Sequence, residues 1–230
     1  MASYVNVGSG VGGVSRSYLP SKRIVFIGDS LTAGNPSPSN RWQAPLETSL
    51  TAALNGKAIL FYSIVAVGGD TTTDMLGRVA SVTALRPDYC IIMCGINDHW
   101  NHLGTPIPPA TSASNVASEI STIKATSPLC KFWYVSGLWY GTENWPDGVG
   151  AEDSLVQATN AAIQAQVQAT ANCTWIDVRT PIYTIDAPAL NPGHANSGVM
   201  SVDGTHPNST GQTVISSRVF AQLPIASFGP

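Results

Sequence analysis

Short apolar runs recur along the chain, separated by longer stretches in which apolar and polar residues are mixed at helical spacing. The runs are bounded by Gly, Pro, Asp and Asn, which favours buried strands, and the mixed stretches predict helices. This alternation predicts an α/β fold in which helices cover a parallel sheet. The predicted strands are residues 24–27, 58–67, 89–94, 132–136 and 174–178. The predicted helices are roughly residues 41–54, 71–85, 112–125, 152–171 and 208–222, with Gly56, Pro87 and Pro128 as stop signals.

The chain shows no sign of more than one folding unit. Its 230 residues suffice for one sizeable core, and no internal repeat, Pro-rich tract or charge run divides them. We therefore expect a flexible leader over residues 1–20 and a single domain over residues 21–230. The leader contains Gly8-x-Gly10-x-x-Gly13, a spacing found in dinucleotide-binding loops. Because this spacing precedes the first predicted strand instead of following it, we assign it to the leader.

Charge and hydropathy exclude several classes of partner. Asp and Glu number 14 against 11 Lys and Arg, and the basic residues are scattered, so we expect no nucleic-acid partner. The most apolar stretch, Ala58–Val67, is shorter than the roughly 20 residues that span a bilayer and predicts a core strand. Residues 1–20 lack the basic and apolar regions of a signal peptide. A charged fraction of only 11%, with abundant Ser, Thr, Asn and Gly, is more typical of an extracellular or particle-borne protein. The oligomeric state is not indicated.

The four cysteines do not form a disulfide framework in a chain of this length. Cys90 and Cys94 lie in one predicted strand, about 13 Å apart when extended, so they are expected to be buried thiols that do not bond to each other. Cys130 and Cys173 each stand just before a predicted strand and could form a disulfide if those strands are neighbours. The alternative is that each is a small core residue.

Residues with chemical potential follow the predicted strands. Ser30 follows the first strand, Gly68-Gly69-Asp70 the second, and Gly95-Ile96-Asn97-Asp98 the third. Asp203-Gly204-Thr205-His206 immediately precedes the final helix. Because ligands bind outside the carboxyl ends of the strands in open α/β sheets, we expect all four segments to lie at one end of the sheet.

Ser30, His206 and Asp203 are the residue types of a serine hydrolase. A serine hydroxyl needs a base to become nucleophilic, usually histidine, and that base needs an orienting acceptor. The backbone N–H groups of Ser30 and Gly69 and the side-chain amide of Asn97 could stabilise the oxyanion of a tetrahedral intermediate. Taken singly, Gly69 could only shape a turn, Asn97 could cap a loop, and Asp203 could cap the last helix. Their joint occurrence favours the catalytic interpretation.

At these residues the chain resembles the SGNH hydrolases, also called the GDSL esterase/lipase family. The resemblance covers residues 24–222, and one departure is the absence of an Asn that many relatives have near Ile64 or Val65. It implies a three-layer α/β/α flavodoxin-like sandwich and ester hydrolysis without a metal or organic cofactor. It also implies that Ser30 is the nucleophile, His206 the general base and Asp203 its orienting group, with Gly69 and Asn97 as oxyanion partners. The four matching blocks are Gly28-Asp29-Ser30-Leu31-Thr32, Val67-Gly68-Gly69-Asp70-Thr71-Thr72, Gly95-Ile96-Asn97-Asp98 and Asp203-Gly204-Thr205-His206-Pro207-Asn208.

Other candidate signals are weaker. The loop around Ser30 lacks the second Gly of the Gly-x-Ser-x-Gly elbow, which disfavours the α/β-hydrolase fold. His99 and His102 have no carboxylate or cysteine partner at a convincing spacing, so no metal site is expected. His194 could compete with His206 as the base, but the three-residue spacing from Asp203 favours His206.

Aromatic residues near the expected site suggest a substrate. Trp100, Trp139, Tyr140 and Trp145 lie in loops after the third and fourth strands. Flat rings with N–H or O–H groups suit sugar rings, so we expect a short-acyl esterase, for example one that removes acetyl groups from carbohydrate. These rings could equally pack the loops onto the core. The alternatives are a lipase or lysophospholipase, a thioesterase, or a non-catalytic carbohydrate-binding domain on the same fold.

Overall fold

The fold is described from a computed structural model for residues 19–34, 41–99, 106–138, 150–186, 198–199 and 205–228. A five-stranded parallel sheet lies at its centre, with the strand order β2-β1-β3-β4-β5. The predicted α/β sandwich with a five-stranded parallel sheet is therefore confirmed. The predicted leader, residues 1–20, lies outside the described residues except for Leu19 and Pro20. The strands are β1 (Ser21–Gly28), β2 (Ile59–Ala66), β3 (Tyr89–Met93), β4 (Lys131–Val135) and β5 (Cys173–Ile176).

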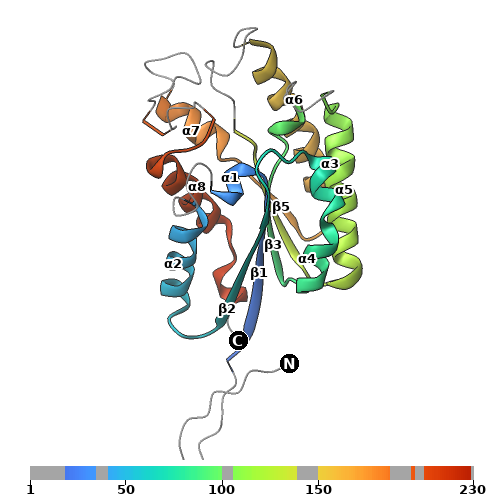
Figure 1. The fold of residues 1–230 in the computed structure, drawn as a ribbon. Helices are drawn as coiled ribbons and strands as arrows, with labels where there is room; N and C mark the ends of the chain where they lie inside the picture. Colours follow the sequence, from blue (N-terminus) through green and yellow to red (C-terminus); the bar gives the residue numbers. More distant parts are fainter. Residues whose placement is uncertain are drawn as a thin grey trace, which may run out of the picture.

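Helices cover both faces of the sheet (Figure 1). One face packs against α2, α7 and α8, and the other packs against α3, α4, α5 and α6. We call these the α2–α8 face and the α3–α6 face. The helices are α1 (Ser30–Ala33), α2 (Gln43–Leu54), α3 (Thr72–Gly77), α4 (Val79–Leu85), α5 (Pro109–Thr126), α6 (Gly150–Gln168), α7 (Arg179–Asp186) and α8 (Ser209–Gln222), with short 3-10 turns η1 (Asn97–His99) and η4 (Ile225–Ser227).

Alternate residues of each central strand bury side chains on opposite faces, as a parallel sheet requires. In β1, Ile24 and Phe26 enter the core of the α2–α8 face, whereas Val25 and Ile27 enter the core of the α3–α6 face. All five residues of β3 are buried. The sheet is therefore a rigid platform on which the loops at its carboxyl edge are mounted.

Local sequence signals explain where the helices begin and end. Asn55 and Arg86 take left-handed conformations, with φ of 45° and 47°, and end α2 and α4. The stretch predicted as one helix over residues 71–85 is instead divided at Arg78, whose φ and ψ of −103° and 4° are not helical. The sequence analysis also missed α1 and α7, whose four and eight residues are too few for a clear periodic pattern. No described helix is long and apolar enough to cross a membrane.

All four cysteines are free thiols. Cys90 and Cys94 are buried, as expected. β4 and β5 are neighbours, yet Cys130 and Cys173 are not joined. The Sγ of Cys130 instead lies 3.7 Å from the Sγ of Cys90 in β3, and the Cys173 thiol donates to the carbonyl of Ala171. Cys130 is therefore a small buried residue of the core, as the alternative to a disulfide predicted.

Candidate active site

Ser30 occupies the turn between β1 and α1, at the carboxyl edge of the sheet. It is the first residue of α1 and is 7% exposed. The preceding Gly28 has no room for a side chain, because a Cβ there would overlap the Thr32 hydroxyl and the carbonyl oxygen of Met93 in β3. Only glycine therefore lets β1 turn sharply while it stays paired with β3. This turn places the Ser30 hydroxyl at the edge where neighbouring loops converge.

Asp29 caps α1 beneath Ser30. Its Oδ1 accepts a hydrogen bond of 2.9 Å from the backbone N–H of Leu31, and its backbone carbonyl accepts from the N–H groups of Thr32 and Ala33. The three N–H groups that follow Ser30 are therefore all bonded to Asp29. The N–H of Ser30 itself is the first backbone donor of α1. Burial is the main cause that raises the pKa of Asp29 to about 7, and the nearby Asp98 carboxylate acts in the same direction.

Gly69 lies in the turn that follows β2, the strand next to β1 in the sheet. Its φ of 84° is in the left-handed region that favours glycine. The turn is closed by a bond from the N–H of Asp70 to the carbonyl of Val67, and it is held to the loop after β3 by a bond of 2.9 Å from Asn97 Nδ2 to the carbonyl of Asp70. The Asn97 side-chain amide therefore lies at the Gly69 turn, with its nitrogen bonded to the backbone of that turn. Gly69 and Asn97 are thereby fixed relative to each other.

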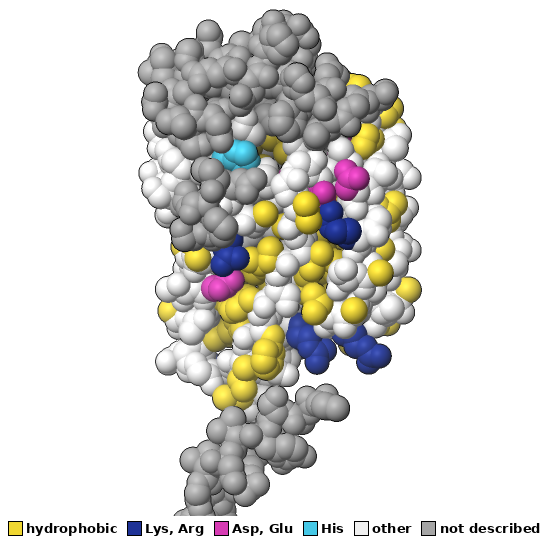
Figure 2. All heavy atoms as spheres, viewed as in Figure 1, with side chains coloured by type: hydrophobic (Ala, Val, Ile, Leu, Met, Phe, Trp, Pro, Cys, Tyr) yellow, Lys and Arg dark blue, Asp and Glu magenta, His cyan; other side chains and the backbone are white. Residues whose placement is uncertain are grey.

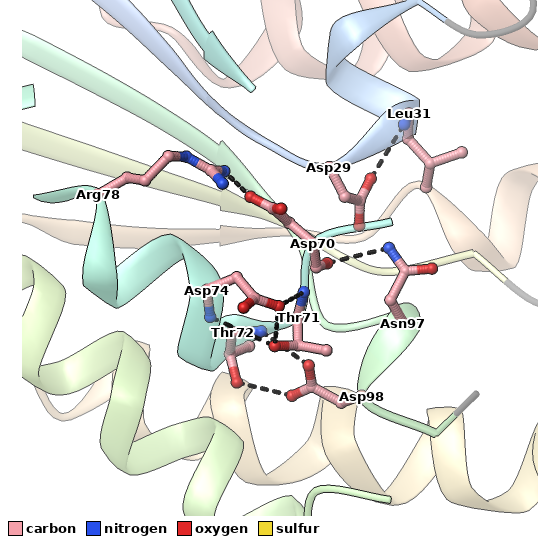
Figure 3. A network of polar contacts seen from close by, with 9 residues as sticks. All are labelled: Asp29, Leu31, Asp70, Thr71, Thr72, Asp74, Arg78, Asn97 and Asp98. Carbon is pink, nitrogen blue, oxygen red and sulfur yellow. Dashed lines mark hydrogen bonds and ion pairs between the residues drawn. The ribbon is translucent and has the colours of Figure 1, made fainter. Parts of the chain in front are cut away.

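Asp98 ties this region to the helices behind it (Figure 3). Its Oδ1 accepts from the backbone N–H of Thr72 at 2.8 Å, and its Oδ2 accepts from the Thr72 hydroxyl at 2.7 Å and from the Ser112 hydroxyl of α5. Burial raises the pKa of Asp98, whereas these hydrogen bonds lower it. Asp98 therefore clamps the start of α3, and with it the Gly69 turn, against α5.

A second anchor holds the same turn from the side of α3. Arg78, between α3 and α4, forms an ion pair with Asp70 (Figure 3). Behind it, Glu119 of α5 is fully buried, and burial raises its pKa to about 7 against the opposing charge of Arg78. Sequence analysis placed Asp98 in the segment after the third strand without giving it a role, and it missed Arg78 and Glu119. The burial of Glu119 could have been predicted from the sequence, because it lies on the same helical face as the apolar residues Val116 and Ile123.

His206 lies directly before α8, and Asp203 lies outside the described residues. The segment is anchored at Asn208, whose side chain caps α8 by accepting from the N–H groups of Thr210 and Gly211. The backbone N–H of Asn208 donates to the carbonyl of Val199 at 2.9 Å. A Cβ at Gly211 would overlap that same carbonyl oxygen, so glycine permits the close approach. The position of His206 is therefore fixed by α8.

The predicted sugar-contacting aromatic residues and the competing histidine lie outside the described residues: these are Trp100, Trp139, Tyr140, Trp145 and His194, together with His102. His99 is described and buried, and its Nε2 lies 2.7 Å from the Thr159 hydroxyl of α6. Burial lowers the pKa of His99. In the described part of the chain, no cluster of three His, Cys, Asp or Glu residues is arranged to hold a metal ion.

A hollow of about 260 Å³ lies beside the carboxyl ends of β4 and β5. Trp175 contributes an aromatic ring that stacks on Tyr134, with 5.5 Å between ring centroids and 5° between planes. Asn160 and Gln164 of α6 contribute side-chain amides to the wall. The Asn160 amide also donates to the carbonyl of Gly137 and accepts from its N–H, which fixes the loop after β4.

Comparison with known proteins adds three findings. The model of the GDSL-like lipase/acylhydrolase family matches residues 26–214. A lipase/acylhydrolase from Enterococcus faecalis is 21% identical, with 91% of this chain and 98% of that chain covered and a TM-score of 0.69. A catalytic mutant of an acetylxylan esterase, Axe2, from Geobacillus stearothermophilus is 19% identical, with coverage of 87% and 93% and a TM-score of 0.68.

A third solved structure, an α/β hydrolase from the metagenome of Lake Arreo in Spain, is 20% identical, with coverage of 89% and 95% and a TM-score of 0.70. At these identities the likenesses establish a shared fold. Curated protein sequences give no significant match.

Proposed function

Because the chain belongs to the GDSL-like lipase/acylhydrolase family and is thus a carboxylic ester hydrolase, we propose that Ser30 is its nucleophile, His206 its general base and Asp203 the group that orients His206. The observation that carries this proposal is the joint anchoring of Ser30, Gly69 and Asn97 at the ends of three adjacent strands. Asn97 is bonded to the Gly69 turn, and Gly28, directly before the Asp29-Ser30 turn, pairs with Ala66 at the end of β2 and Met93 at the end of β3.

The proposed reaction proceeds in two steps. In the first, the Ser30 hydroxyl attacks the ester carbonyl carbon while His206 takes the hydroxyl proton, and the carbonyl oxygen becomes an oxyanion. The N–H groups of Ser30 and Gly69 and the side-chain amide of Asn97 donate to that oxyanion. His206 then protonates the departing alcohol, which leaves an acyl group on Ser30. In the second step, His206 deprotonates a water molecule that attacks the acyl carbon; the bond to the Ser30 oxygen breaks, His206 returns the proton to that oxygen, and the acid is released.

The direct test is hydrolysis of p-nitrophenyl acetate by wild type, Ser30→Ala and His206→Ala. We expect kcat to fall by roughly 10³- to 10⁶-fold in both variants, because members of a catalytic triad act as a unit. Asp203→Asn should lower kcat by roughly 10²- to 10⁴-fold. His194→Ala is the control for the competing base and should retain wild-type turnover. Retained activity in Ser30→Ala would contradict the assignment of the nucleophile. Loss of activity in His194→Ala, together with retained activity in His206→Ala, would contradict the assignment of the base.

We further propose that the natural substrate is a short-acyl ester, specifically an acetylated carbohydrate, on the basis of the hollow beside β5. An aromatic ring beside side-chain amides, as at Trp175, Asn160 and Gln164, is the combination that suits a sugar ring and its hydroxyl groups. The shared fold with an acetylxylan esterase is compatible with this substrate class.

Two comparisons test the substrate. Turnover of acetyl, butyryl and longer p-nitrophenyl esters should decline with chain length, and a preference for long chains would favour the lipase or lysophospholipase alternative. Gln164→Ala should raise KM for acetylated xylo-oligosaccharides while leaving p-nitrophenyl acetate hydrolysis unchanged. A folded wild type that binds glycans but hydrolyses no ester in these panels would favour the non-catalytic binding domain.

A further inference from the structure

β2 forms one edge of the sheet and lacks the features that usually protect an edge strand. Among the described residues its only strand neighbour is β1. Its eight residues, Ile59–Ala66, include no proline and no charged side chain. Edge strands in monomeric proteins are normally short, charged, bulged or interrupted by proline, because unpaired backbone groups invite pairing with another chain. The opposite edge strand, β5, has only four residues.

The hydrogen bonds to β1 show which backbone groups of β2 face outward. The N–H of Ile59 donates to the carbonyl of Pro20 at 2.9 Å, and the N–H of Val67 donates to the carbonyl of Gly28 at 3.2 Å. Odd-numbered residues of β2 therefore direct their backbone groups toward β1. Because the direction alternates along a strand, the N–H and C=O groups of Leu60, Tyr62, Ile64 and Ala66 point toward the open edge.

The same edge exposes apolar side chains on one face. Ile59, Phe61 and Val67 are 37%, 49% and 48% exposed, and all three are odd-numbered, so they point toward the α3–α6 face. A groove of about 360 Å³ lies beside Phe61, between β2 and the end of α4, and is also lined by Ser63 and Leu85 among others. Figure 2 shows hydrophobic side chains gathered in a band along this edge, between the helices of the two faces.

We propose that β2 pairs antiparallel with β2 of a second copy of this chain, about a two-fold axis at Ser63, to form a continuous ten-stranded sheet. In this register the outward backbone groups meet as hydrogen-bonded pairs, Tyr62 with Ile64 and Leu60 with Ala66. The exposed Ile59 faces Val67 of the second copy, and Phe61 faces Val65. Each apolar side chain thus meets another apolar side chain, and a two-fold axis closes the assembly at two copies.

The charges beside the band support a second copy in this orientation. Arg23 and Arg86 line the groove near the beginning of β2, and the exposed Asp74 lies in α3, beyond the other end of the strand. In Figure 2, Lys and Arg side chains gather beside the lower end of the band, and beside the upper end acidic side chains lie next to a basic one. Antiparallel pairing separates the two basic ends and places each one beside the acidic end of the other copy.

The first test is the molar mass of the full chain in solution, measured by light scattering over roughly 1–100 µM because dimerisation depends on concentration. We expect about 48 kDa, twice the 24.1 kDa of one chain. Phe61→Lys should shift the protein to the monomer. Leu129→Lys is the matched control, since Leu129 is 89% exposed and lies before β4, and it should leave the dimer intact. A wild type that stays monomeric throughout this range would overturn the proposal.

A second test needs no disruptive substitution. Ser63→Cys is nearly isosteric, and residues opposite each other on the two-fold axis form a non-hydrogen-bonded pair with about 4.5 Å between Cα atoms. Mild oxidation should therefore link two copies of this variant through the introduced thiols and yield a covalent dimer on a non-reducing gel. Wild type and Leu129→Cys, treated in the same way, should remain mainly unlinked. A dimer that does not crosslink at this position, or that persists in Phe61→Lys, would contradict pairing through β2.

Discussion

The two faces of the sheet are built from different chemistry. The core of the α2–α8 face is apolar and aromatic: Phe26 meets Trp42 edge-on at 5.4 Å, and Tyr89 stacks on Phe228 at 4.3 Å. Among the described residues the apolar cluster of this face contains no cysteine. The α3–α6 face contains the thiols of Cys90, Cys94 and Cys130 in its core. Two buried carboxyl groups also belong to this face: Asp98 accepts hydrogen bonds from α3 and α5, and Glu119 lies in α5.

This difference in chemistry suggests that one face mainly stabilises the fold and the other mainly positions the residues of the candidate site. Apolar packing gains free energy in proportion to the area buried, without fixing one orientation strongly. A buried carboxylate that accepts three hydrogen bonds, as Asp98 does, fixes the groups that donate to it but makes the fold sensitive to pH. We therefore expect the α2–α8 face to determine stability and the α3–α6 face to determine the geometry of the Gly69 turn.

The largest effect is expected on the apolar face. Phe228→Ala removes a fully buried ring that stacks on Tyr89 and should lower the free energy of unfolding by roughly 3–5 kcal/mol. The kcat of the folded variant should match that of wild type. Chemical denaturation and initial rates of p-nitrophenyl acetate hydrolysis measure the two quantities. A large fall in kcat with the fold intact would remove the proposed separation between the faces.

Asp98→Asn should show the converse pattern. An amide has only one oxygen, so it cannot accept all the bonds from Thr72 and Ser112, and the Gly69 turn loses part of its support. We expect kcat to fall roughly 100-fold with little change in KM, since the lost alignment concerns the oxyanion. Asp88→Asn is the matched control, because Asp88 accepts from the N–H of Arg23 at the other end of the sheet. Equal losses of activity in both variants would contradict a positioning role.

Glu119→Gln tests the pH sensitivity of the α3–α6 face. Burial raises the pKa of Glu119 from 4.5 to about 7, so the unfolded chain releases this proton at lower pH than the folded one. Stability of the wild type should therefore decrease as pH rises from about 4.5 to 7. The variant should lack this component and be more stable by on the order of 3 kcal/mol above pH 7, with little difference below pH 4.5. Denaturation curves at pH 4.5, 6 and 8 measure the gap, and a constant gap would contradict the assignment.

The smallest effect is expected from Asn115→Ala. Asn115 Nδ2 lies 3.1 Å from the Thr72 hydroxyl and 3.0 Å from the Thr73 hydroxyl, so it supports α3 from the outer side. Its removal should cost about 1 kcal/mol of stability and change kcat by less than about threefold. Thermal unfolding and steady-state rates give both values. A kcat loss as large as that of Asp98→Asn would show that any contact to Thr72, and not the buried carboxylate in particular, controls the turn.

The sequence was sufficient for the sheet because each strand combines an apolar run with clear boundary residues. It was less informative where tertiary contacts decide. Arg78 interrupts an otherwise helical pattern, and its side chain pairs with Asp70 in the preceding loop. Likewise, Cys130 stands before β4, but which neighbouring strand it contacts depends on the direction of its side chain. Such contacts join residues far apart in the chain and leave no local pattern.

The same distinction applies to the candidate site. The positions of Ser30, Gly69 and Asn97 after successive strands could be predicted, because parallel strands bring their carboxyl ends to one edge. The clamp formed by Asp98 could not, since its partners Thr72 and Ser112 are 26 and 14 residues away and belong to two helices. The catalytic roles of Ser30, His206 and Asp203 stay predictions that the variants above test.

The order in which the strands and helices occur has a consequence for biosynthesis. β1 pairs with β2 and β3, so the first hundred residues contain every strand that carries Ser30, Gly69 and Asn97. His206 arrives only with α8, the last long helix, which packs against α2 from the beginning of the chain. Because domains begin to fold during synthesis from the N-terminus, we expect the proposed oxyanion donors to assemble on the ribosome before His206, the proposed base, has been synthesised. Catalytic competence would then begin only after α8 has been synthesised and has packed against α2.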